Sequence, residues 1–510
     1  MNRPDLSKML LGAAAAVSLL VGSAALTPSQ AQQSVLRIGL QEDPDMLDPH
    51  KARTFVGRIV FKGLCDKLFD ASPDLQLIPR LATEWSFSGD GLTATLKLRA
   101  GVKYHDGTAF DAASAKANLD RARTLPDSLR RSELATIDSI DVVDPLTIAI
   151  RLKQRDATLL SQLADRAGMM LSPATFAGDV GARPICTGPY RFVERVQNDR
   201  IVLEKFADHW EAANYSFDRV IYRSIPDTTV RLANLRSGEL DMIERLAATD
   251  VKSAQADRNL RVVFTPGLGY QGATLNHNNG DAANTPFGKD KRVRQAFSWA
   301  IDRAVLNQVV FEGTHTPTMQ AFPPSSPYFR KDMPATPRDV AKARALLREA
   351  GVTAPLKLEM MITNNPVDAQ LGQMIQAMVQ EAGFDLSLRS MEFATQLREQ
   401  QQGRFQISRV GWSGRIDPDG NVHPFWTTGG GQNDGKYSNP EVDRLLNAAR
   451  AAYSLEERKK LYDAAQTIAN DEMPVLYLYN QPWYYATSAR ISGFQLHPDG
   501  MIRLAGMKRQ

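Results

Sequence analysis

Residues 356–388, LKLEMMITNNPVDAQLGQMIQAMVQEAGFDLSL, decide the fold class of this chain. Apolar and polar residues alternate over 356–360 and again over 384–388, as they do in half-buried strands. The residues between these two runs have the pattern of a helix that ends near Gly383. A strand, a helix and a strand in this order predict a right-handed crossover in a sheet that contains parallel strands. The chain is therefore expected to be an α/β protein.

Helix signals surround this unit on both sides. Thr336 is followed by a proline at 337 and a carboxylate at 339. This pattern predicts an N-cap at Thr336 and a helix that ends at Gly351. Residues 292–303 carry an apolar stripe at helical spacing and predict one core-facing helix. Asn439 and Ser454 each precede a further amphipathic segment and predict two more N-caps.

The N-terminal half mixes strands and helices in the same way. Residues 93–99 alternate polar and apolar residues and predict a half-buried strand. Residues 110–122 have helical character, and either Asp111 or Ser114 is expected to cap this helix. No Pro- or Ser-rich linker separates the two halves, which suggests lobes between which the chain passes more than once.

The first 31 residues have the pattern of a secretory signal peptide. Arg3 and Lys8 precede an apolar stretch over 9–26, and small residues at 29 and 31 predict cleavage after Ala31. A membrane anchor is the alternative, which the Gly and Ser residues of the stretch disfavour. No cysteine lies near the cleavage site, so lipid attachment through an N-terminal cysteine is excluded. The mature protein is expected in the periplasm of a Gram-negative cell.

Composition narrows the function classes. The 510 residues are 43% hydrophobic and 23% charged, which is typical of globular proteins with several domains. The formal net charge is only +4 and there is no basic run, so binding to nucleic acid is disfavoured. The two cysteines, Cys65 and Cys186, allow one possible disulfide. Two buried free thiols are an equally good interpretation of the sequence.

The sequence contains no convincing motif for catalysis or for cofactor binding. Residues 267–272 match G-x-G-x-x-G, but a strand pattern follows where a dinucleotide site needs a helix. The seven histidines are scattered singly, so neither a zinc site nor another metal site is predicted. No G-x-S-x-G elbow or S-x-x-K pair occurs. We expect a binding protein without a cofactor rather than an enzyme.

Aromatic residues in loops give the strongest binding signal. Trp412, Trp426, Trp483, Tyr270 and Tyr437 lie near Gly or Pro rather than at helical spacing. Core packing accounts for any one of them. Together they suit a cleft between lobes, where ring faces enclose a ligand and a few polar groups orient it.

Seven short stretches, in order along the chain, resemble one family. They are 46–49 (MLDP), 81–85 (LATEW), 98–107 (LRAGVKYHDG), 186–190 (CTGPY), 235–241 (LRSGELD), 293–303 (VRQAFSWAIDR) and 437–443 (YSNPEVD). The chain is similar to the extracytoplasmic solute-binding proteins of peptide, nickel and opine ABC importers. This is family 5, which includes dipeptide-, oligopeptide- and glutathione-binding proteins. The similarity covers essentially the whole mature chain.

The resemblance implies a periplasmic binding protein-like fold, with two large α/β lobes that close over a ligand cleft and a smaller third lobe. By analogy, lobe I combines 32–56, 184–265 and 485–510, the small lobe II covers 57–183, and lobe III spans 266–484. The implied function is to capture a peptide-like or acidic small molecule and deliver it to a membrane permease with separate ATPase subunits. The protein is expected to be a monomer.

Other functions remain as alternatives. Capture of a nickel chelate or of haem is the alternative within the family. An exported hydrolase and a chaperone-like peptide holdase are the alternatives outside it.

The resemblance also suggests where a ligand would be held. Peptide-binding relatives carry an Asp shortly after a Trp in the last lobe, where it meets the α-ammonium group of the ligand. Here the best register after Trp412 places Arg415 at that position, and a guanidinium fits a carboxylate or phosphate instead. A shift of two residues would make Asp417 the partner of an amine. The expected ligand-binding residues are Trp412, Arg415, Asp417, Tyr270, Asn276 and Glu42.

Overall fold

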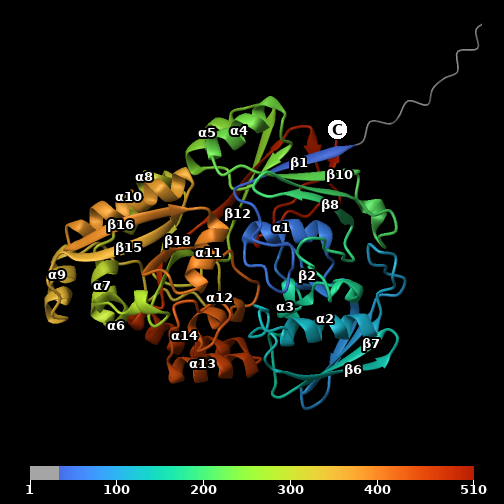
Figure 1. Cartoon of the computed structure of the whole chain (residues 1–510), viewed down its shortest axis with the longest axis horizontal. Coiled ribbons are helices and arrows are strands. Elements are labelled where there is room, and N and C mark those ends of the chain that lie inside the picture. The colour runs from blue at the N-terminus through green and yellow to red at the C-terminus, as the bar shows by residue number, and fades with distance from the viewer. Residues whose placement is uncertain (1–33) are drawn as a thin grey trace, which may run out of the picture. The chain divides into compact units, whose positions relative to one another are not determined.

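The computed structural model describes residues 34–510, which form one compact unit (Figure 1). The predicted signal peptide and its cleavage site lie outside these residues. Three larger sheets, each with its own helices and hydrophobic core, organise the described chain. Within residues 34–510, no helix combines the length and the apolar character needed to cross a membrane.

Strands from near the beginning and near the end of the described chain meet in a seven-stranded sheet. Its strands, in spatial order, are β12 (Leu260–Pro266), β19 (Pro482–Ser488), β11 (Met242–Ile243), β1 (Val35–Leu40), β10 (Arg219–Ser224), β9 (Arg200–Lys205) and β8 (Tyr190–Val196). Strand β1 runs parallel to both of its neighbours, β10 and β11. Helix α1 (Phe55–Leu64) packs its apolar side into the core of this sheet. Helices α4 (Thr228–Ser237) and α5 (Val251–Gln255) belong to a second, smaller core.

A four-stranded antiparallel sheet is built from the residues between α1 and β8. Its order is β4 (Ala82–Phe87), β5 (Thr93–Leu98), β7 (Thr147–Leu152) and β6 (Ile137–Asp144). Helix α2 (Ala112–Thr124) covers it, and both predicted capping residues take part. The Asp111 carboxylate accepts from the Ser114 N–H at 2.8 Å, and the Ser114 hydroxyl accepts from the Asp111 N–H at 2.9 Å. Smaller elements here are β2 (Phe69–Ala71), β3 (Leu77–Pro79) and α3 (Leu159–Gln162).

The predicted crossover lies in a six-stranded sheet. Its order is β14 (Thr316–Pro317), β18 (Val475–Asn480), β13 (Gln271–Leu275), β17 (Ile407–Arg409), β15 (Leu356–Thr363) and β16 (Phe384–Met391). Strands β15 and β16 pair in parallel from Leu356 opposite Phe384 to Thr363 opposite Met391, and α10 (Pro366–Gln380) connects them. The α/β prediction is therefore confirmed. The other elements are α11 (Phe393–Gln401), α12 (Asp419–Trp426) and, at the chain end, β20 (Ile491–Ser492) and β21 (Lys508–Arg509).

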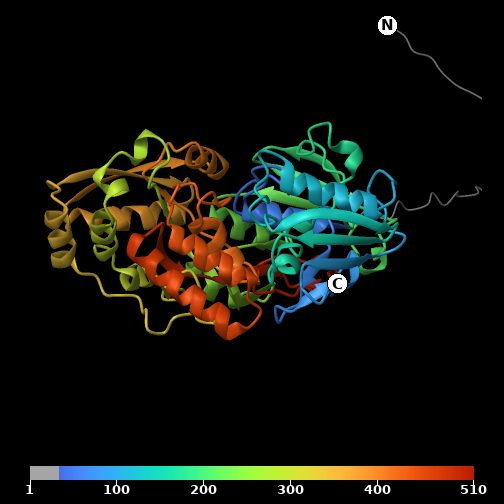
Figure 2. The ribbon, with the colours of Figure 1, turned by 90° about the horizontal axis from the view of Figure 1, so that it is seen from below.

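Helices α13 (Pro440–Ala451) and α14 (Leu455–Glu472) begin where the sequence predicts. The Asn439 side chain caps the first, the Ser454 hydroxyl caps the second, and the two helices pack side by side (Figure 2). The apolar stripe predicted over 292–303 lies in the core, but the predicted helix ends early, because Asp302 caps a new helix. The segment is divided between α7 (Lys291–Trp299) and α8 (Arg303–Phe311), which follow the short α6 (Pro286–Lys289).

The predicted N-cap at Thr336 is also wrong. Helix α9 (Val340–Glu349) begins three residues later, where the Asp339 carboxylate accepts from the Lys342 N–H at 2.8 Å. The Arg338 guanidinium donates to the Ala300 carbonyl at 2.7 Å and anchors the preceding residues in a non-helical conformation.

Cys65 and Cys186 form a disulfide, so the alternative of two free thiols is wrong. Both cysteines are buried in the core of the seven-stranded sheet. The bond joins the end of α1 to the segment before β8, across a sequence separation of 121 residues. A cross-link that closes so long a loop restricts the unfolded chain strongly.

The chain passes between the seven- and six-stranded sheets at two adjacent segments, 267–270 and residue 481. Gly267 and Gly269 of the G-x-G-x-x-G match belong to the first of them, and Gly272 already lies in β13, the strand predicted after the match. A Cβ atom on Gly267 would lie 2.5 Å from the Gln481 carbonyl oxygen, and one on Gly269 would lie 1.8 Å from the Trp412 carbonyl oxygen. These glycines therefore allow backbones to approach closely and do not bind a phosphate.

The resemblance implied one lobe from residues 32–56, 184–265 and 485–510, a small lobe from 57–183 and a third lobe from 266–484. The lobe boundaries themselves stay a prediction.

Candidate functional site

A cavity of about 380 Å³ lies where parallel strands of two sheets end. Gln41 and Glu42 follow β1, and Arg245 follows β11. From the six-stranded sheet, Thr363 ends β15 and Arg409 ends β17. Ligands of α/β proteins bind outside the carboxyl ends of parallel strands. The cavity also has the size of a site for a small molecule.

Aromatic rings form much of the cavity wall. Trp483 stacks on Phe55 with ring centres 4.5 Å apart and an interplanar angle of 6°. On the other side, Trp412 meets Phe425 edge to face at 4.9 Å, and Tyr270 pairs with the Trp412 backbone through two hydrogen bonds of 3.0 and 2.8 Å. Such rings enclose the apolar parts of a ligand and exclude water.

Arg245 supplies a cation to one wall. Its backbone is left-handed, with φ 49°, which is uncommon for a residue other than glycine. The guanidinium lies over the Phe55 ring at 4.7 Å and 3.4 Å from the Glu42 carboxylate. Its Nε is 3.3 Å from Glu244 but makes no hydrogen bond to any residue in 34–510. A buried N–H without an acceptor is available to a ligand.

Arg409 supplies a second cation from the facing sheet. It donates to the Tyr479 hydroxyl at 2.8 Å and to Gln271 Oε1 at 3.1 Å, and it lies 3.3 Å from Asp368. Its Nε is buried and likewise lacks a hydrogen-bond partner among the described residues. Burial acts to lower the pKa of the Arg409 guanidinium. Tyr479 and Asp368 nevertheless raise this pKa above its usual value, and the charge of Arg245 acts against the increase.

Glu42 is the most perturbed acid of the cavity. Burial raises its pKa from 4.5 to about 7, although the charge of Arg245 opposes this shift. The carboxylates of Glu244 and Asp368 raise it further. Glu42 therefore exchanges a proton close to neutral pH.

Of the expected ligand-binding residues, Trp412, Tyr270 and Glu42 line the cavity. Asn276, Arg415 and Asp417 do not, because other groups of the protein hold their side chains. Asn276 Nδ2 donates to the Phe405 carbonyl at 2.7 Å.

Arg415 and Asp417 are each engaged in a buried ion pair. Arg415 Nε lies 2.9 Å from the Asp165 carboxylate, so the guanidinium expected to receive an anionic ligand group already has an anionic partner. Asp417 accepts two hydrogen bonds from Arg458, at 2.9 and 2.7 Å. Neither Arg415 nor Asp417 therefore lines this cavity.

Two of the five aromatic residues expected at a cleft are core residues instead. Trp426 lies in α12, not in a loop, is fully buried, and donates to the Tyr477 hydroxyl at 3.1 Å. Tyr437 is buried beside it in the same hydrophobic cluster. Trp412, Trp483 and Tyr270 are the three that reach the cavity.

The charged residues Arg245, Arg409 and Asp368 are not apparent from the sequence. One signal was present: Asp368 follows the strand predicted at 356–360, and side chains that follow parallel strands gather at one sheet edge. Arg245 follows a strand of only two residues, which leaves no periodic pattern. No group of three or more His, Cys, Asp or Glu side chains within residues 34–510 could hold a metal ion.

Comparisons with known proteins agree with this geometry. Residues 76–433 match the middle region of the bacterial extracellular solute-binding proteins, family 5. The chain is 33% identical over 472 residues to a glutathione-binding protein of Pectobacterium atrosepticum, which covers 89% of this chain and 90% of the relative. It is 31% identical over 468 residues to the glutathione-binding protein of Escherichia coli K12, with 89% and 90% covered.

Solved structures of the same kind share the fold. The binding protein for agropinic acid from Agrobacterium tumefaciens has a TM-score of 0.86 at 24% identity, with 93% of this chain and 99% of that chain covered. The murein tripeptide-binding protein of Escherichia coli has a TM-score of 0.87 at 22% identity, with 94% and 99% covered. The predicted periplasmic binding protein-like fold is confirmed, and the chain belongs to family 5 of the bacterial extracellular solute-binding proteins.

Proposed function

We propose that this protein captures a small, net-anionic, peptide-like molecule of the glutathione type in the periplasm. It delivers the ligand to the membrane permease of an ABC importer whose ATPase subunits are separate chains. The observation that carries the ligand class is the pair of arginines on facing walls, Arg245 and Arg409, each with a buried Nε that makes no hydrogen bond within residues 34–510. Two guanidinium groups that repel each other across a cavity are best neutralised by an anion between them.

The charge of the lining supports this ligand class. Arg53, Arg245 and Arg409 face two acids, Glu42 and Asp368. Arg53 is already neutralised by Asp434 at 2.5 Å, and Glu42 is partly protonated at neutral pH. Among the lining residues, positive charge therefore exceeds negative charge, and Glu244, which does not line the cavity but lies 3.3 Å from Arg245 Nε, offsets part of this excess.

The ligand groups can be assigned to the residues that complement them. Arg245 and Arg409 each donate the Nε–H that lacks a hydrogen-bond partner to one ligand carboxylate, a charge-assisted hydrogen bond. Asp368 receives the ammonium group. The rings of Trp412, Trp483 and Tyr270 enclose the remaining atoms. Glutathione has two carboxylates and one ammonium group. The names of the glutathione-binding relatives therefore support this assignment.

A thermal unfolding panel tests the proposal on mature protein that has been unfolded and refolded to remove carried ligand. The panel contains glutathione, agropinic acid, the dipeptide Met-Leu and a nickel–histidine chelate. We expect glutathione to raise the unfolding midpoint, because a ligand at 100 times its Kd adds about 2.7 kcal/mol. Met-Leu is expected to have little effect. A larger shift with Met-Leu or with the nickel chelate would contradict the anionic ligand class.

The alternatives outside the family have their own readouts in the same samples. Intact glutathione after long incubation is expected, and its hydrolysis would identify an enzyme. A preference for unfolded polypeptides over every compound of the panel would identify a holdase.

Binding of glutathione is expected to be coupled to proton uptake near pH 7. A ligand carboxylate on Arg245 takes away the cation that opposes protonation of Glu42, so the Glu42 pKa rises above about 7. The affinity should therefore increase as the pH falls from about 8 to about 6. Calorimetry at pH 7 in two buffers with different ionisation enthalpies measures the protons bound.

Glu42→Gln is the control, because the amide cannot take up a proton. Its binding enthalpy should be independent of the buffer. The stability of the free protein provides a second check on sign: a folded-state pKa above 4.5 means that Glu42 destabilises the fold above about pH 7, and this effect disappears as the pH falls toward 4.5. Proton release on binding would show that Glu42 meets a cationic group of the ligand instead.

A further inference from the structure

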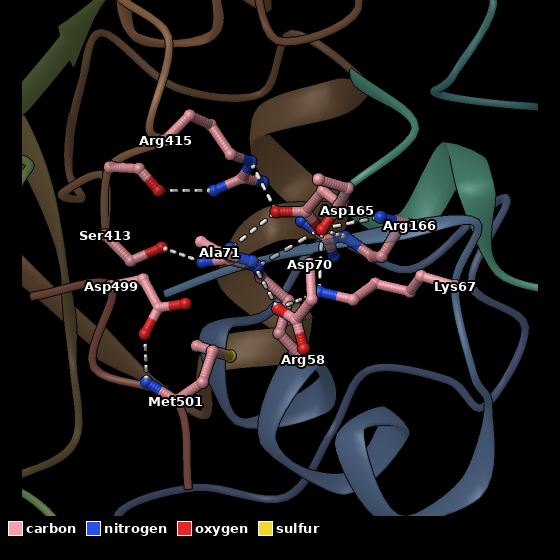
Figure 3. Close-up of polar contacts among 12 residues, drawn as sticks. Arg58, Lys67, Asp70, Ala71, Asp165, Arg166, Ser413, Arg415, Asp499 and Met501 are labelled. Atoms are coloured by element: carbon pink, nitrogen blue, oxygen red, sulfur yellow. Dashed lines mark hydrogen bonds and ion pairs between the residues drawn. The ribbon is translucent and has the colours of Figure 1, made fainter. Parts of the chain in front are cut away.

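Residues 57–183 contribute no side chain to the cavity lining, although this whole segment is described by the structure. Two of its residues, Arg58 and Asp165, nevertheless contact the loop 412–415, which forms part of the cavity wall. Figure 3 shows the side chains of Arg58 and Asp165 converging on Ser413 and Arg415. The segment therefore reaches the site indirectly.

Arg415 connects Asp165 to a cavity residue. Its Nε lies 2.9 Å from the Asp165 carboxylate, and its guanidinium lies over the Trp412 ring at 4.1 Å. A Cβ atom on Gly420 would be only 2.7 Å from the Arg415 side chain, so the glycine makes room for this packing. Arg415 thus packs against the Trp412 ring by a cation–π contact although it does not line the cavity itself.

Arg58 makes the second connection. Its Nη1 donates to the Ser413 hydroxyl at 3.1 Å, and Ser413 lines the cavity. The same guanidinium donates to both oxygens of Asp165, at 3.2 and 2.5 Å. Asp165 therefore fixes both arginines, and each of them contacts a different part of the loop.

Asp165 is also the acid that balances the local positive charge. Arg58, Arg166 and Arg415 all lie within 4 Å of its carboxylate and are all buried or nearly so. Burial alone would raise the pKa of Asp165, but Arg415, Arg58 and Arg166 hold it well below its usual range. Removal of this one charge would leave three buried cations facing one another, which is strongly unfavourable.

We infer that Asp165 is a positioning residue for ligand capture: through Arg415 and Arg58 it joins residues 57–183 to the loop of Trp412 and Ser413 and holds that wall of the cavity in place. Residues 57–183 thereby act as a latch on the loop 412–415. This inference rests on the proposed function for its ligand, but the contact itself does not depend on which ligand binds.

The test replaces Asp165 by Asn, which keeps the shape and removes the charge. Spin labels on cysteines introduced at the exposed residues Lys153 and Lys460 report the distance between the two sides of the latch. No free cysteine competes for the labels among residues 34–510. In ligand-free protein, Asp165→Asn is expected to add a population at longer distance. Dissociation of glutathione is expected to become at least about tenfold faster, equivalent to about 1.4 kcal/mol.

Asp66→Asn is the matched control. Asp66 is a buried acid of the same segment, but its partners are His209, Trp210 and Arg80, none of which contacts the loop. This variant is expected to lose stability without a change in the distance distribution. Asp165→Glu, which restores the charge, is expected to recover most of the short distance. Adding Arg415→Gln to Asp165→Asn should cost less than the sum of the single changes.

The outcomes separate the two proposals. If wild-type protein fails to bind glutathione while Asp165→Asn still lengthens the distance, the ligand proposal fails and the latch stands. If glutathione binds but the distances and dissociation rates of Asp165→Asn and Asp66→Asn are the same, the latch is contradicted. If Asp165→Asn does not fold, the same distances and dissociation rates are measured on Asp165→Glu and Arg415→Gln, which change the same contact.

Discussion

Arg245→Ala is expected to weaken glutathione binding at least about a hundredfold, which corresponds to about 2.7 kcal/mol. The loss has two parts. The ligand carboxylate loses its guanidinium partner, and Glu42 loses the cation that lies 3.4 Å from it. Truncating one member of a buried charge pair typically costs about 2–5 kcal/mol, because the other member is left unpaired. Calorimetric titration of wild type and variant measures the change.

The unusual backbone of Arg245 makes a sharper comparison possible. At φ 49°, glycine is less strained than alanine, so Arg245→Gly should be the more stable of the two variants. Both should bind equally weakly if the guanidinium is responsible. Arg245→Lys keeps the charge without the fork and should fall between them and the wild type. Arg444→Ala, at an exposed arginine of α13, is the control without effect on binding. Nearly wild-type affinity of Arg245→Gly would remove Arg245 from the site.

Gly269→Ala is expected to destabilise the protein by about 3 kcal/mol or more. The added methyl group would lie 1.8 Å from the Trp412 carbonyl oxygen and 2.7 Å from the Gly414 nitrogen, so two backbones must separate. That movement breaks the hydrogen bonds between Tyr270 and Trp412. Both residues line the cavity, and glutathione binding should therefore weaken as well. Urea unfolding and calorimetry measure the two effects.

Gly89→Ala is the matched control, because nothing lies within 4 Å of a Cβ atom built there. Its stability and affinity are expected to remain at the wild-type level. A harmless Gly269→Ala would mean that the crossing segment relaxes easily and that close approach is not the reason for its glycine.

Elements with strong local signals were predictable from the sequence. The strand–helix–strand unit of β15, α10 and β16 shows two clean periodicities, and the caps at Asn439 and Ser454 depend only on the residues next to them. The start of α9 could not be predicted from the sequence, because Thr336 and Asp339 are both good N-cap residues. The choice between them depends on Arg338, whose guanidinium reaches the carbonyl oxygens of Ala300 and Met378.

The site was predictable only in part, for a related reason. Trp412, Tyr270 and Glu42 could be expected, but Arg415 could not be assigned correctly, because its partner Asp165 belongs to a distant part of the sequence. An arginine after a tryptophan looks the same whether it meets a ligand or a buried carboxylate. Only the folded chain shows which acid is within reach.

Strand β19 inserts between β11 and β12, although all the other strands of its sheet precede residue 267. Both of its ladders are antiparallel, and β11 and β12 do not pair with each other. The sheet that the first strand begins is thus incomplete until nearly the last residues have been synthesised. During translation the N-terminal part exposes unpaired strand edges and an open core, and contacts of such long sequence separation form slowly. Completion of this sheet therefore waits for the synthesis of residues 482–488, long after its other strands have been made.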